Sequence, residues 1–191
     1  MKAELREIAT VQMGYSFRSR LEVSEGGDIA VIQMKDLTDR GVVDIAGLAQ
    51  VNLEGLKEHH LVKCGDLVFR SRGLAATSAI LRVDLGQAVV AAPLLRIRTN
   101  PEIILPEYLN WLINQPVAQA YLASRAKGTA VKMISKQALE GIEVIPPPLD
   151  RQQAIIDLVA LAEKEQILMA RFADRRKQYI SRKLMQLTQG E

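Results

Sequence analysis

The sequence is short of cysteine, of long apolar runs and of leader-like segments. Cys64 is the only cysteine among 191 residues, so no disulfide can form within the chain and a reducing cytoplasm is the expected location. No apolar run approaches the ~20 residues that a membrane-spanning helix needs, and the mixed charges after Met1 do not resemble a signal peptide. These absences argue against a disulfide-stabilised secreted protein and against a membrane protein.

Recognisable catalytic motifs are also missing. The only two histidines, His59 and His60, are adjacent, and together with Cys64 they do not match the ligand spacing of a structural zinc site. The sequence has no Ser-His-Asp or Cys-His arrangement, no Gly-x-Gly cofactor loop and no phosphate-binding Gly-x-x-x-x-Gly-Lys loop. We therefore expect no catalytic residue, no cofactor and no metal ligand in this chain.

Two enzyme classes can still be considered, each from one short stretch of the sequence. Ile145-Pro-Pro-Pro148 superficially resembles the Asp/Asn-Pro-Pro-Tyr/Phe site of adenine methyltransferases, but neither end residue can orient or stack on a flipped base. A small metal-dependent nuclease would need clustered carboxylates and a lysine, and Asp28 with Lys35 is the nearest approach. That alternative predicts magnesium-dependent DNA cleavage that is lost in the Lys35→Ala variant.

Three successive prolines, Pro146 to Pro148, divide the sequence into two parts. They fix φ and donate no backbone hydrogen bonds, so they form a stiff extended arm. From residue 149 to residue 187 neither proline nor glycine occurs, and apolar residues recur at helical spacings of three and four. We predict a compact domain over residues 1–148 and one long helix over residues 149–191. The apolar positions expected to pack are Ile155, Leu158, Val159, Ala162, Met169, Phe172, Tyr179, Ile180, Leu184 and Leu187.

The predicted helix is too long to be covered by its own domain. At 1.5 Å per residue, a helix of roughly 38 residues is about 57 Å long. That length exceeds the diameter of a domain of ~150 residues, so the far half of the helix needs another helix as a partner. The sequence favours a coiled coil between chains, although Gln166, Arg176 and Lys183 interrupt a strict heptad seam.

The first 148 residues have the mixed pattern of an α+β domain. Buried strands are expected at residues 29–33, 67–69 and 94–98, and residues 79–83 are expected to pair with residues 88–91 across Gly86. Helices are expected at residues 2–10, 106–114 and 116–126, the last two with proline at their start. Ser135 is expected to cap a short helix that ends near Glu140.

Charge does not by itself demand a nucleic-acid partner. The formal net charge is +3, and the same excess arises after residue 162, where seven basic residues face four acidic ones. The chain before residue 163 is therefore neutral overall, and DNA binding would have to rely on local clusters. Residues 14–20, 70–73 and 127–132 each combine glycine with basic and hydroxyl groups, and arginine forks suit guanine edges and phosphates.

Several stretches, taken in order, resemble the DNA-specificity subunits of type I restriction–modification systems. The strongest is Ile145-Pro-Pro-Pro-Leu-Asp-Arg-Gln-Gln-Ala-Ile-Ile156, which is similar to the Pro-Pro-Leu-x-x-Gln-x-x-Ile junction of that family. The others are Leu5-Arg-Glu-Ile-Ala9, Gly14-Tyr-Ser-Phe17, Ile32-Gln-Met-Lys-Asp-Leu37, Gly65-Asp-Leu-Val-Phe-Arg-Ser-Arg-Gly73, Leu105-Pro-Glu-Tyr-Leu109 and Lys127-Gly-Thr-Ala130. The resemblance covers nearly the whole chain as one half of such a subunit.

The resemblance implies a target-recognition domain over residues 1–148 that reads one half of a split DNA site. It also implies that residues 149–191 act as spacer and dimerisation helix, pairing antiparallel in a homodimer or beside a different half-subunit. The implied partners are double-stranded DNA, a DNA adenine methyltransferase subunit and, where the system has one, a restriction subunit, with all catalysis in those partners. The expected DNA contacts are Ser16, Arg18, Arg20, Lys35, Arg70, Arg72, Lys127, Thr129 and Lys132.

An assembly or interaction protein without a DNA role is the alternative outside the enzymes. It would use the long helix as a coiled-coil rod. It differs from the specificity subunit in a measurable way, because it predicts no salt-dependent binding to duplex DNA even when a methyltransferase is present.

Overall fold

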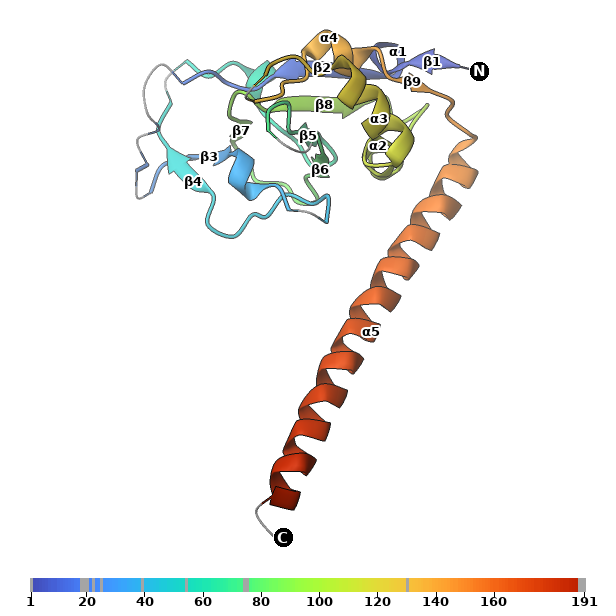
Figure 1. Cartoon of the computed structure of the whole chain (residues 1–191). Helices are drawn as coiled ribbons and strands as arrows, with labels where there is room; N and C mark the ends of the chain where they lie inside the picture. Colours follow the sequence, from blue (N-terminus) through green and yellow to red (C-terminus); the bar gives the residue numbers. More distant parts are fainter. Residues whose placement is uncertain are drawn as a thin grey trace. The chain divides into compact units, whose positions relative to one another are not determined.

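The computed structural model describes residues 2–17, 21, 23–24, 26–38, 40–53, 55–73, 76–129 and 131–188. The chain forms two compact units, Met1–Gln152 and Gln153–Glu191. The first unit combines short strands and helices, and the second holds most of one long helix, α5 (Leu149–Thr188) (Figure 1). The predicted α+β class with a long C-terminal helix is confirmed. Within the described ranges, no helix is both long and apolar enough to cross a membrane.

Among the described residues, three small sheets form the framework of the first unit. The central sheet has the antiparallel order β2 (Ala9–Met13), β8 (Leu95–Thr99), β5 (Leu67–Phe69) and β6 (Ser78–Ile80). The second sheet has the order β4 (Ala49–Val51), β3 (Ile29–Ile32) and β7 (Ala88–Val90), with β3 and β7 parallel. A two-residue ladder joins β1 (Ala3–Glu4) to β9 (Glu143–Val144), so both ends of this unit meet.

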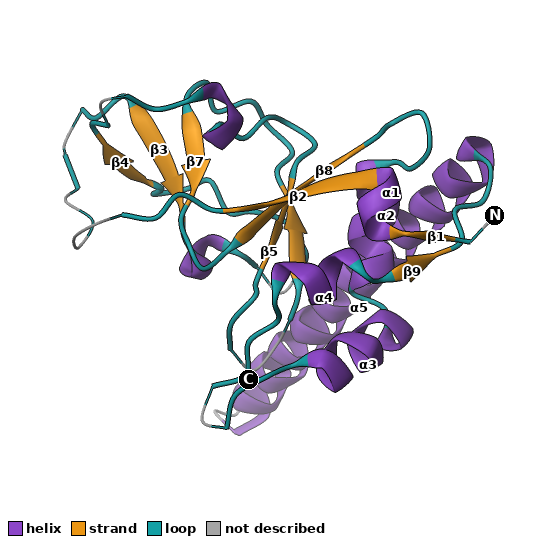
Figure 2. Ribbon diagram, turned by 90° about the horizontal axis from the view of Figure 1, so that it is seen from above, coloured by secondary structure: helices purple, strands orange, loops and turns teal. Residues whose placement is uncertain are grey.

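The helices of the first unit gather toward one end, away from the β4–β3–β7 sheet (Figure 2). They are α1 (Leu5–Ile8), α2 (Pro106–Ile113), α3 (Pro116–Arg125) and α4 (Lys136–Glu140), and two 3-10 turns are η1 (Met34–Asp36) and η2 (Glu58–His60). As predicted, α2 and α3 begin with proline, because the first helical residue needs no N–H donor. The Ser135 hydroxyl accepts the Ala138 N–H at 3.1 Å and caps α4, also as predicted.

Two local predictions are wrong. Residues 79–83 do not pair with residues 88–91, because β6 pairs with β5 while β7 lies in the other sheet, parallel to β3. Both β3 and β7 are buried along their whole length, and continuous apolar strands are typical of such parallel pairs. The helix expected over residues 2–10 is limited to α1, because burial then alternates from Ala9 through Val11 and the chain enters β2.

The apolar core of the first unit extends across both larger sheets. One buried cluster joins β3 and β7 with β5 and β6, and a second lies on the opposite face of β3, β4 and β7. Leu67, Phe69, Leu95 and Ile97, on the neighbouring strands β5 and β8, are all fully buried. The exposure of β8 rises to half-buried only at its last two residues. The domain therefore has an ordinary apolar interior, and its chemistry has to be sought on the loops that leave these strands.

Helix α5 begins directly after the prolines and is fastened at its first turn by one buried polar side chain. Gln152 is 0% exposed. Its amide oxygen accepts the Leu105 N–H at 2.9 Å, and its amide nitrogen donates to the carbonyl oxygens of Ile103 at 2.9 Å and Pro147 at 2.8 Å. This glutamine is the one in the Pro-Pro-Leu-x-x-Gln stretch, so the motif has a structural explanation: it ties the helix start to the loop before α2.

Candidate nucleic-acid interface

Two loops that the sequence singled out separately are joined by backbone pairing. Met133 bridges to both Arg72 and Lys127 in antiparallel fashion. The Gly73 N–H donates to the Lys132 carbonyl oxygen at 3.1 Å, and the Lys127 N–H donates to the Met133 carbonyl oxygen at 3.0 Å. We call residues 70–73 and 127–134 together the basic loop pair. Its two halves lie side by side although they are more than fifty positions apart in the sequence.

The basic loop pair lines one side of a small hollow of about 110 Å³. Arg72 and Lys132 are both exposed and both line it, while Gln119 and Ala123 of α3 form its other wall. The Gln119 amide nitrogen is already used, because it donates to the Ala76 and Ile113 carbonyl oxygens at 2.9 and 2.8 Å. The side-chain charge around the hollow is therefore positive, which suits a phosphate or a base edge that carries acceptors.

Arg70 is placed differently from its neighbour Arg72. It is half-buried, and one guanidinium nitrogen donates to the carbonyl oxygens of Met34 and Leu37, both at 3.1 Å. Its Nε is buried and has no partner among the described residues. Arg70 thus fastens η1, which carries the exposed Lys35, to the basic loop pair.

The loop after β2 reaches the same region through the turn at Pro93. The Tyr15 carbonyl oxygen accepts the Ala92 N–H at 2.9 Å, and the Ser71 hydroxyl donates to the Pro93 carbonyl oxygen. Ser16, which follows, is exposed. The Pro93 turn therefore lies between the start of this loop and the basic loop pair, so three separate segments of the chain converge here.

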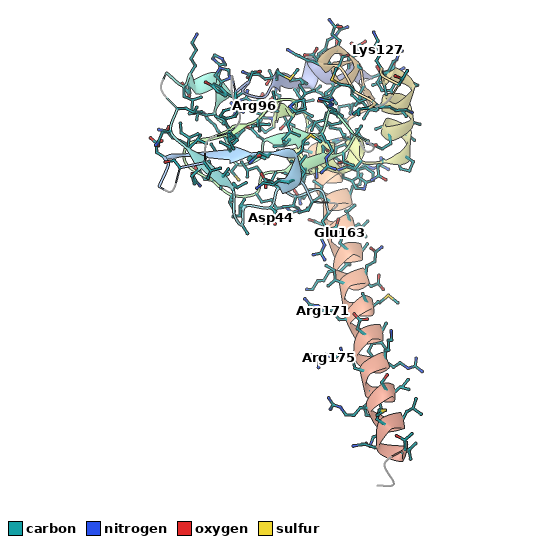
Figure 3. The ribbon with its side chains drawn as sticks, turned by 60° about the vertical axis from the view of Figure 1, so that its left-hand side comes forward. Asp44, Arg96, Lys127, Glu163, Arg171 and Arg175 are labelled. Atoms are coloured by element: carbon teal, nitrogen blue, oxygen red, sulfur yellow. The ribbon has the colours of Figure 1, made fainter. Side chains whose placement is uncertain are left out.

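The expected DNA contacts can now be placed. Lys35, Arg72, Lys127, Thr129 and Lys132 are exposed and lie on segments joined to one another, and Ser16 is exposed beside the Pro93 turn. Arg70 is held by internal hydrogen bonds. Arg18 and Arg20 lie outside the described residues. Lys127 lies at the margin of this unit opposite Asp44 (Figure 3).

The acidic residue of η1 is turned inward. Asp36 is 7% exposed, and its carboxylate accepts the Gln33 N–H at 2.7 Å in a capping arrangement. Its neighbour Lys35 is exposed and is left to face solvent. The negative charge of this turn is therefore used to fix the backbone, and the positive charge stays available at the surface.

Two arginines of β8, neither of them among the predicted site residues, have structural positions. Arg96 is 7% exposed, and it donates to the carbonyl oxygens of His59 and Leu61 at 2.9 and 2.8 Å (Figure 3). Burial lowers the pKa of Arg96, and the nearby Arg98 lowers it further. The signal was present as arginine at alternate positions of an apolar strand, which puts both side chains on one face.

Arg98 forms the only ion pair with a buried carboxylate among the described residues. Its Nε and Nη2 donate to the two oxygens of Asp66 at 2.7 and 2.6 Å, and Asp66 is 2% exposed. The hydrogen bond to Asp66 raises the pKa of Arg98. Because Arg98 also donates to the Leu61 carbonyl oxygen at 3.2 Å, both arginines hold the segment after η2 against the central sheet.

The described residues contain no group of three or more His, Cys, Asp or Glu side chains placed to hold a metal ion. The rings of His59 and His60 have centroids 4.0 Å apart and are tilted by 48° to each other, and Tyr15 meets His60 edge-on at 5.3 Å. Burial, followed by the charge of His59, lowers the pKa of His60. Cys64 is exposed.

The described chain thus combines a mixed α+β domain, in which distant basic loops are joined, with one long C-terminal helix. The family model for the type I restriction modification DNA specificity domain matches residues 1–167. The chain belongs to this family, as the resemblance of its motifs predicted. No curated protein sequence matches the chain.

Solved structures show the same fold. The HsdS subunit from Thermoanaerobacter tengcongensis superposes with a TM-score of 0.64 at 16% identity, covering 86% of this chain and 37% of that one. A chain from a structure of type I R-M system assembly gives 0.61 at 16% identity, with 86% and 38% covered. The type I S subunit from M. genitalium gives 0.56 at 11% identity, with 86% and 39% covered. The chain thus spans less than two fifths of the length of these structures.

Proposed function

We propose that this chain is a sequence-specific DNA-binding subunit of a type I restriction–modification system. The observation that carries the proposal is the basic loop pair, which places the exposed residues Arg72, Lys127 and Lys132 on loops joined by backbone pairing in a member of this family. Backbone pairing fixes the positions of these cations, and preordered cations on loops are what phosphate and base-edge contacts require. The same proposal places the chain in the cytoplasm, where its DNA would be.

Within this function the exposed and the internal cations have different roles. Arg72 and Lys132 would contact DNA directly, and Arg70 would act through η1 by holding Lys35 in place. A planar arginine fork suits a guanine edge, whereas a lysine suits a phosphate. The remaining proposed contacts are Ser16, Arg18, Arg20, Lys127 and Thr129.

We further propose that the chain reads one half-site and that two copies assemble through antiparallel α5 helices. The two-fold symmetry of such a dimer would make the full site inverted and bipartite, with the length of α5 setting the gap. The packing residues would be Ile155, Leu158, Val159, Ala162, Met169, Phe172, Tyr179, Ile180, Leu184 and Leu187. Methylation and, where present, cleavage would belong to methyltransferase and restriction subunits docked on this dimer, so the chain itself would be non-catalytic.

The test starts by selecting bound duplexes from a randomised library with the full chain, alone and together with the adenine methyltransferase of its own host. The selected duplex then serves as probe at several salt concentrations. Arg72→Ala should weaken binding by about 1–3 kcal/mol and relax one position of the site, whereas Lys132→Ala should weaken all duplexes alike and lower the salt slope by about one. Arg82→Ala, an exposed arginine outside the basic loop pair, is the matched control.

The outcomes separate the proposal from its competitors. Absence of salt-dependent duplex binding under both conditions would favour an assembly protein without a DNA role. Binding that responds equally to Arg72→Ala and Arg82→Ala would remove the basic loop pair from the interface. Magnesium-dependent cleavage by the purified chain, lost in Lys35→Ala, would instead favour a nuclease.

A further inference from the structure

Helix α5 carries an exposed apolar stripe that repeats every eleven residues. Leu158, Met169 and Ile180 are spaced by eleven, and all three are large apolar side chains exposed by 45–66%. The positions three, four and seven residues after each of them complete the repeat. These positions are occupied by Leu161, Ala162, Glu165, Phe172, Ala173, Arg176, Lys183, Leu184 and Leu187. Only three members of the stripe are charged, namely Glu165, Arg176 and Lys183.

An eleven-residue repeat explains why no strict heptad seam could be found. Eleven residues in three turns give about 3.67 residues per turn, close to the straight α-helix, so the stripe runs along α5 with little drift. Gln166, which breaks a heptad reading, is no longer a member of the stripe. The helix face that the stripe leaves free is charged, and Arg171 and Arg175 project together from it (Figure 3).

The charged members of the stripe decide the direction in which a second copy can pack. A parallel, in-register pair would place Glu165 against Glu165, Arg176 against Arg176 and Lys183 against Lys183 at the contact, which is unfavourable at each position. An antiparallel pair can place Glu165 of each copy opposite Arg176 of the other. The two-fold symmetry then forms that ion pair twice.

The register set by the ion pair also covers the stripe. Pairing Glu165 with Arg176 puts the two-fold axis midway between residues 170 and 171. The stripe runs from Leu158 to Leu187, and in this register each of its members lies opposite a residue of α5. Pairing Glu165 with Lys183 would instead move the axis to residue 174 and place Leu158 opposite residue 190, beyond the end of α5.

The surface of α5 fits this arrangement. A shallow hollow on the helix is lined by Phe172, Ala173, Arg176, Lys177, Ile180 and Ser181. In the register centred near Arg171, Met169 of the second copy lies opposite Phe172 and Ala173, and Glu165 lies opposite Arg176 and Lys177. The small side chain of Ala173 leaves room for a large apolar residue, and the two cations beside it meet the carboxylate.

We propose that α5 binds a second copy of itself antiparallel, with the two-fold axis beside Arg171 and with Glu165–Arg176 ion pairs selecting this direction and register. This inference rests on the proposed dimer and specifies its contact. In this arrangement the positions of Glu165 and Arg176 along α5 would set the register of the two helices, and the register would set the gap between the two half-sites.

Charge reversal in the full chain tests the ion pair. Glu165→Lys should raise the dimer dissociation constant at least about tenfold in sedimentation equilibrium at low salt, because two attractive pairs become repulsive. The control Glu163→Lys makes the same change off the stripe and should stay within about threefold. The double variant Glu165→Lys with Arg176→Glu should return to within about threefold of the unmodified chain. Equal effects of Glu165→Lys and Glu163→Lys, or a double variant weaker than either single reversal, would overturn the inference.

Spin-label distances test the register independently of charge. Cys64 is exposed and is first replaced by serine, and single cysteines are then introduced by Lys164→Cys, Arg171→Cys and Gln178→Cys on the face opposite the stripe. Each residue of distance from the two-fold axis adds about 3 Å of separation along the helices. Positions 164 and 178 should therefore give similar distances, with offsets of about 20 and about 23 Å. Position 171 should give the shortest distance.

The possible results are distinct from those of the DNA experiment. Three equal distances would show a parallel pair. A distance at position 164 much longer than that at position 178 would show the register centred on residue 174. Either result would refute the inference, although two copies would still form a dimer. A chain that stays monomeric at high concentration refutes the inference and the dimer together. Selective binding to duplex DNA is measured in a separate experiment, so none of these results decides the proposed DNA-binding function.

Discussion

Replacing Gln152 by alanine is the change for which the structure predicts the clearest effect on stability. The side chain is 0% exposed and its amide makes three hydrogen bonds, to the Leu105 N–H and to the carbonyl oxygens of Ile103 and Pro147. Alanine removes all three hydrogen bonds. The Leu105 N–H then lacks an acceptor, and the two carbonyl oxygens must find water.

The magnitude follows from what each group loses. A buried N–H left without a partner costs roughly 1–3 kcal/mol, and each of two lost bonds to carbonyl oxygens that water can reach costs about 0.5–1.5 kcal/mol. The free energy of unfolding should therefore fall by about 4 kcal/mol, which is large against the roughly 5–15 kcal/mol of an ordinary domain. Gln152→Glu should cost at least as much, because a carboxylate keeps the bond from Leu105 but faces two carbonyl oxygens without a proton to donate.

Urea unfolding followed by the fluorescence of Trp111, the single tryptophan, measures this loss in the first unit. The matched control is Gln153→Ala, since Gln153 is exposed and its amide nitrogen donates to the side chain of Asp157 at 2.8 Å. The control should stay within about 0.5 kcal/mol of the unmodified chain. If the helix start opens locally instead, amide exchange at Leu105 should accelerate about a hundredfold. A Gln152→Ala variant that matches Gln153→Ala in both measurements would refute this account of the junction.

Three further predictions concern the first unit. Gly128→Ala should lower duplex affinity at least about tenfold with little loss of stability. Gly128 has φ +112°, and an added Cβ would meet a backbone oxygen of its own loop. The control Gly47→Ala, also at positive φ but with open space around it, should leave duplex affinity unchanged. Asp66→Asn should lower the free energy of unfolding by about 3 kcal/mol in urea, because it leaves Arg98 without its buried carboxylate. Burial holds the pKa of His60 in the folded state below its ordinary value of about 6.5. The stability linked to His60 is therefore complete above that value and is lost as the pH falls below it, and His60→Asn should flatten the fall in urea midpoint as the pH is lowered from 6.5.

The elements that the sequence predicted well are those whose signals are local. Proline at the first position of α2 and α3, the Ser135 cap of α4, and the uninterrupted stretch after Pro148 each act within a few residues. Strands β3 and β5 were predicted from short apolar runs bounded by polar residues or turns. Such signals depend on the residue and its neighbours, so they survive without any knowledge of the rest of the fold.

Strand pairing was not predictable in the same way, because it depends on which distant strand offers a matching buried face. The turn at Gly86 is present, with its N–H donating to Asp84, yet the strands on its two sides enter different sheets. A turn signal establishes that the chain changes direction, and it does not establish that the flanking strands are partners. The parallel pairing of β7 with β3 becomes visible only when both strands are known to be buried on both faces.

The same limit applies to the interface, where arginines in similar sequence contexts have different roles in the fold. Arg70 and Arg72 are two positions apart beside the same serine, and local chemistry assigns both to DNA. In the fold Arg70 donates to the carbonyl oxygens of Met34 in η1 and of Leu37 just after it, while Arg72 has no such partner in the described part of the chain and remains exposed. Whether a guanidinium is free to read a base is decided by the carbonyl groups within its reach, and those come from a segment more than thirty residues earlier. A basic residue in a glycine loop is therefore a reason to look for an interface, and its surroundings in the fold decide whether it is a contact or a support.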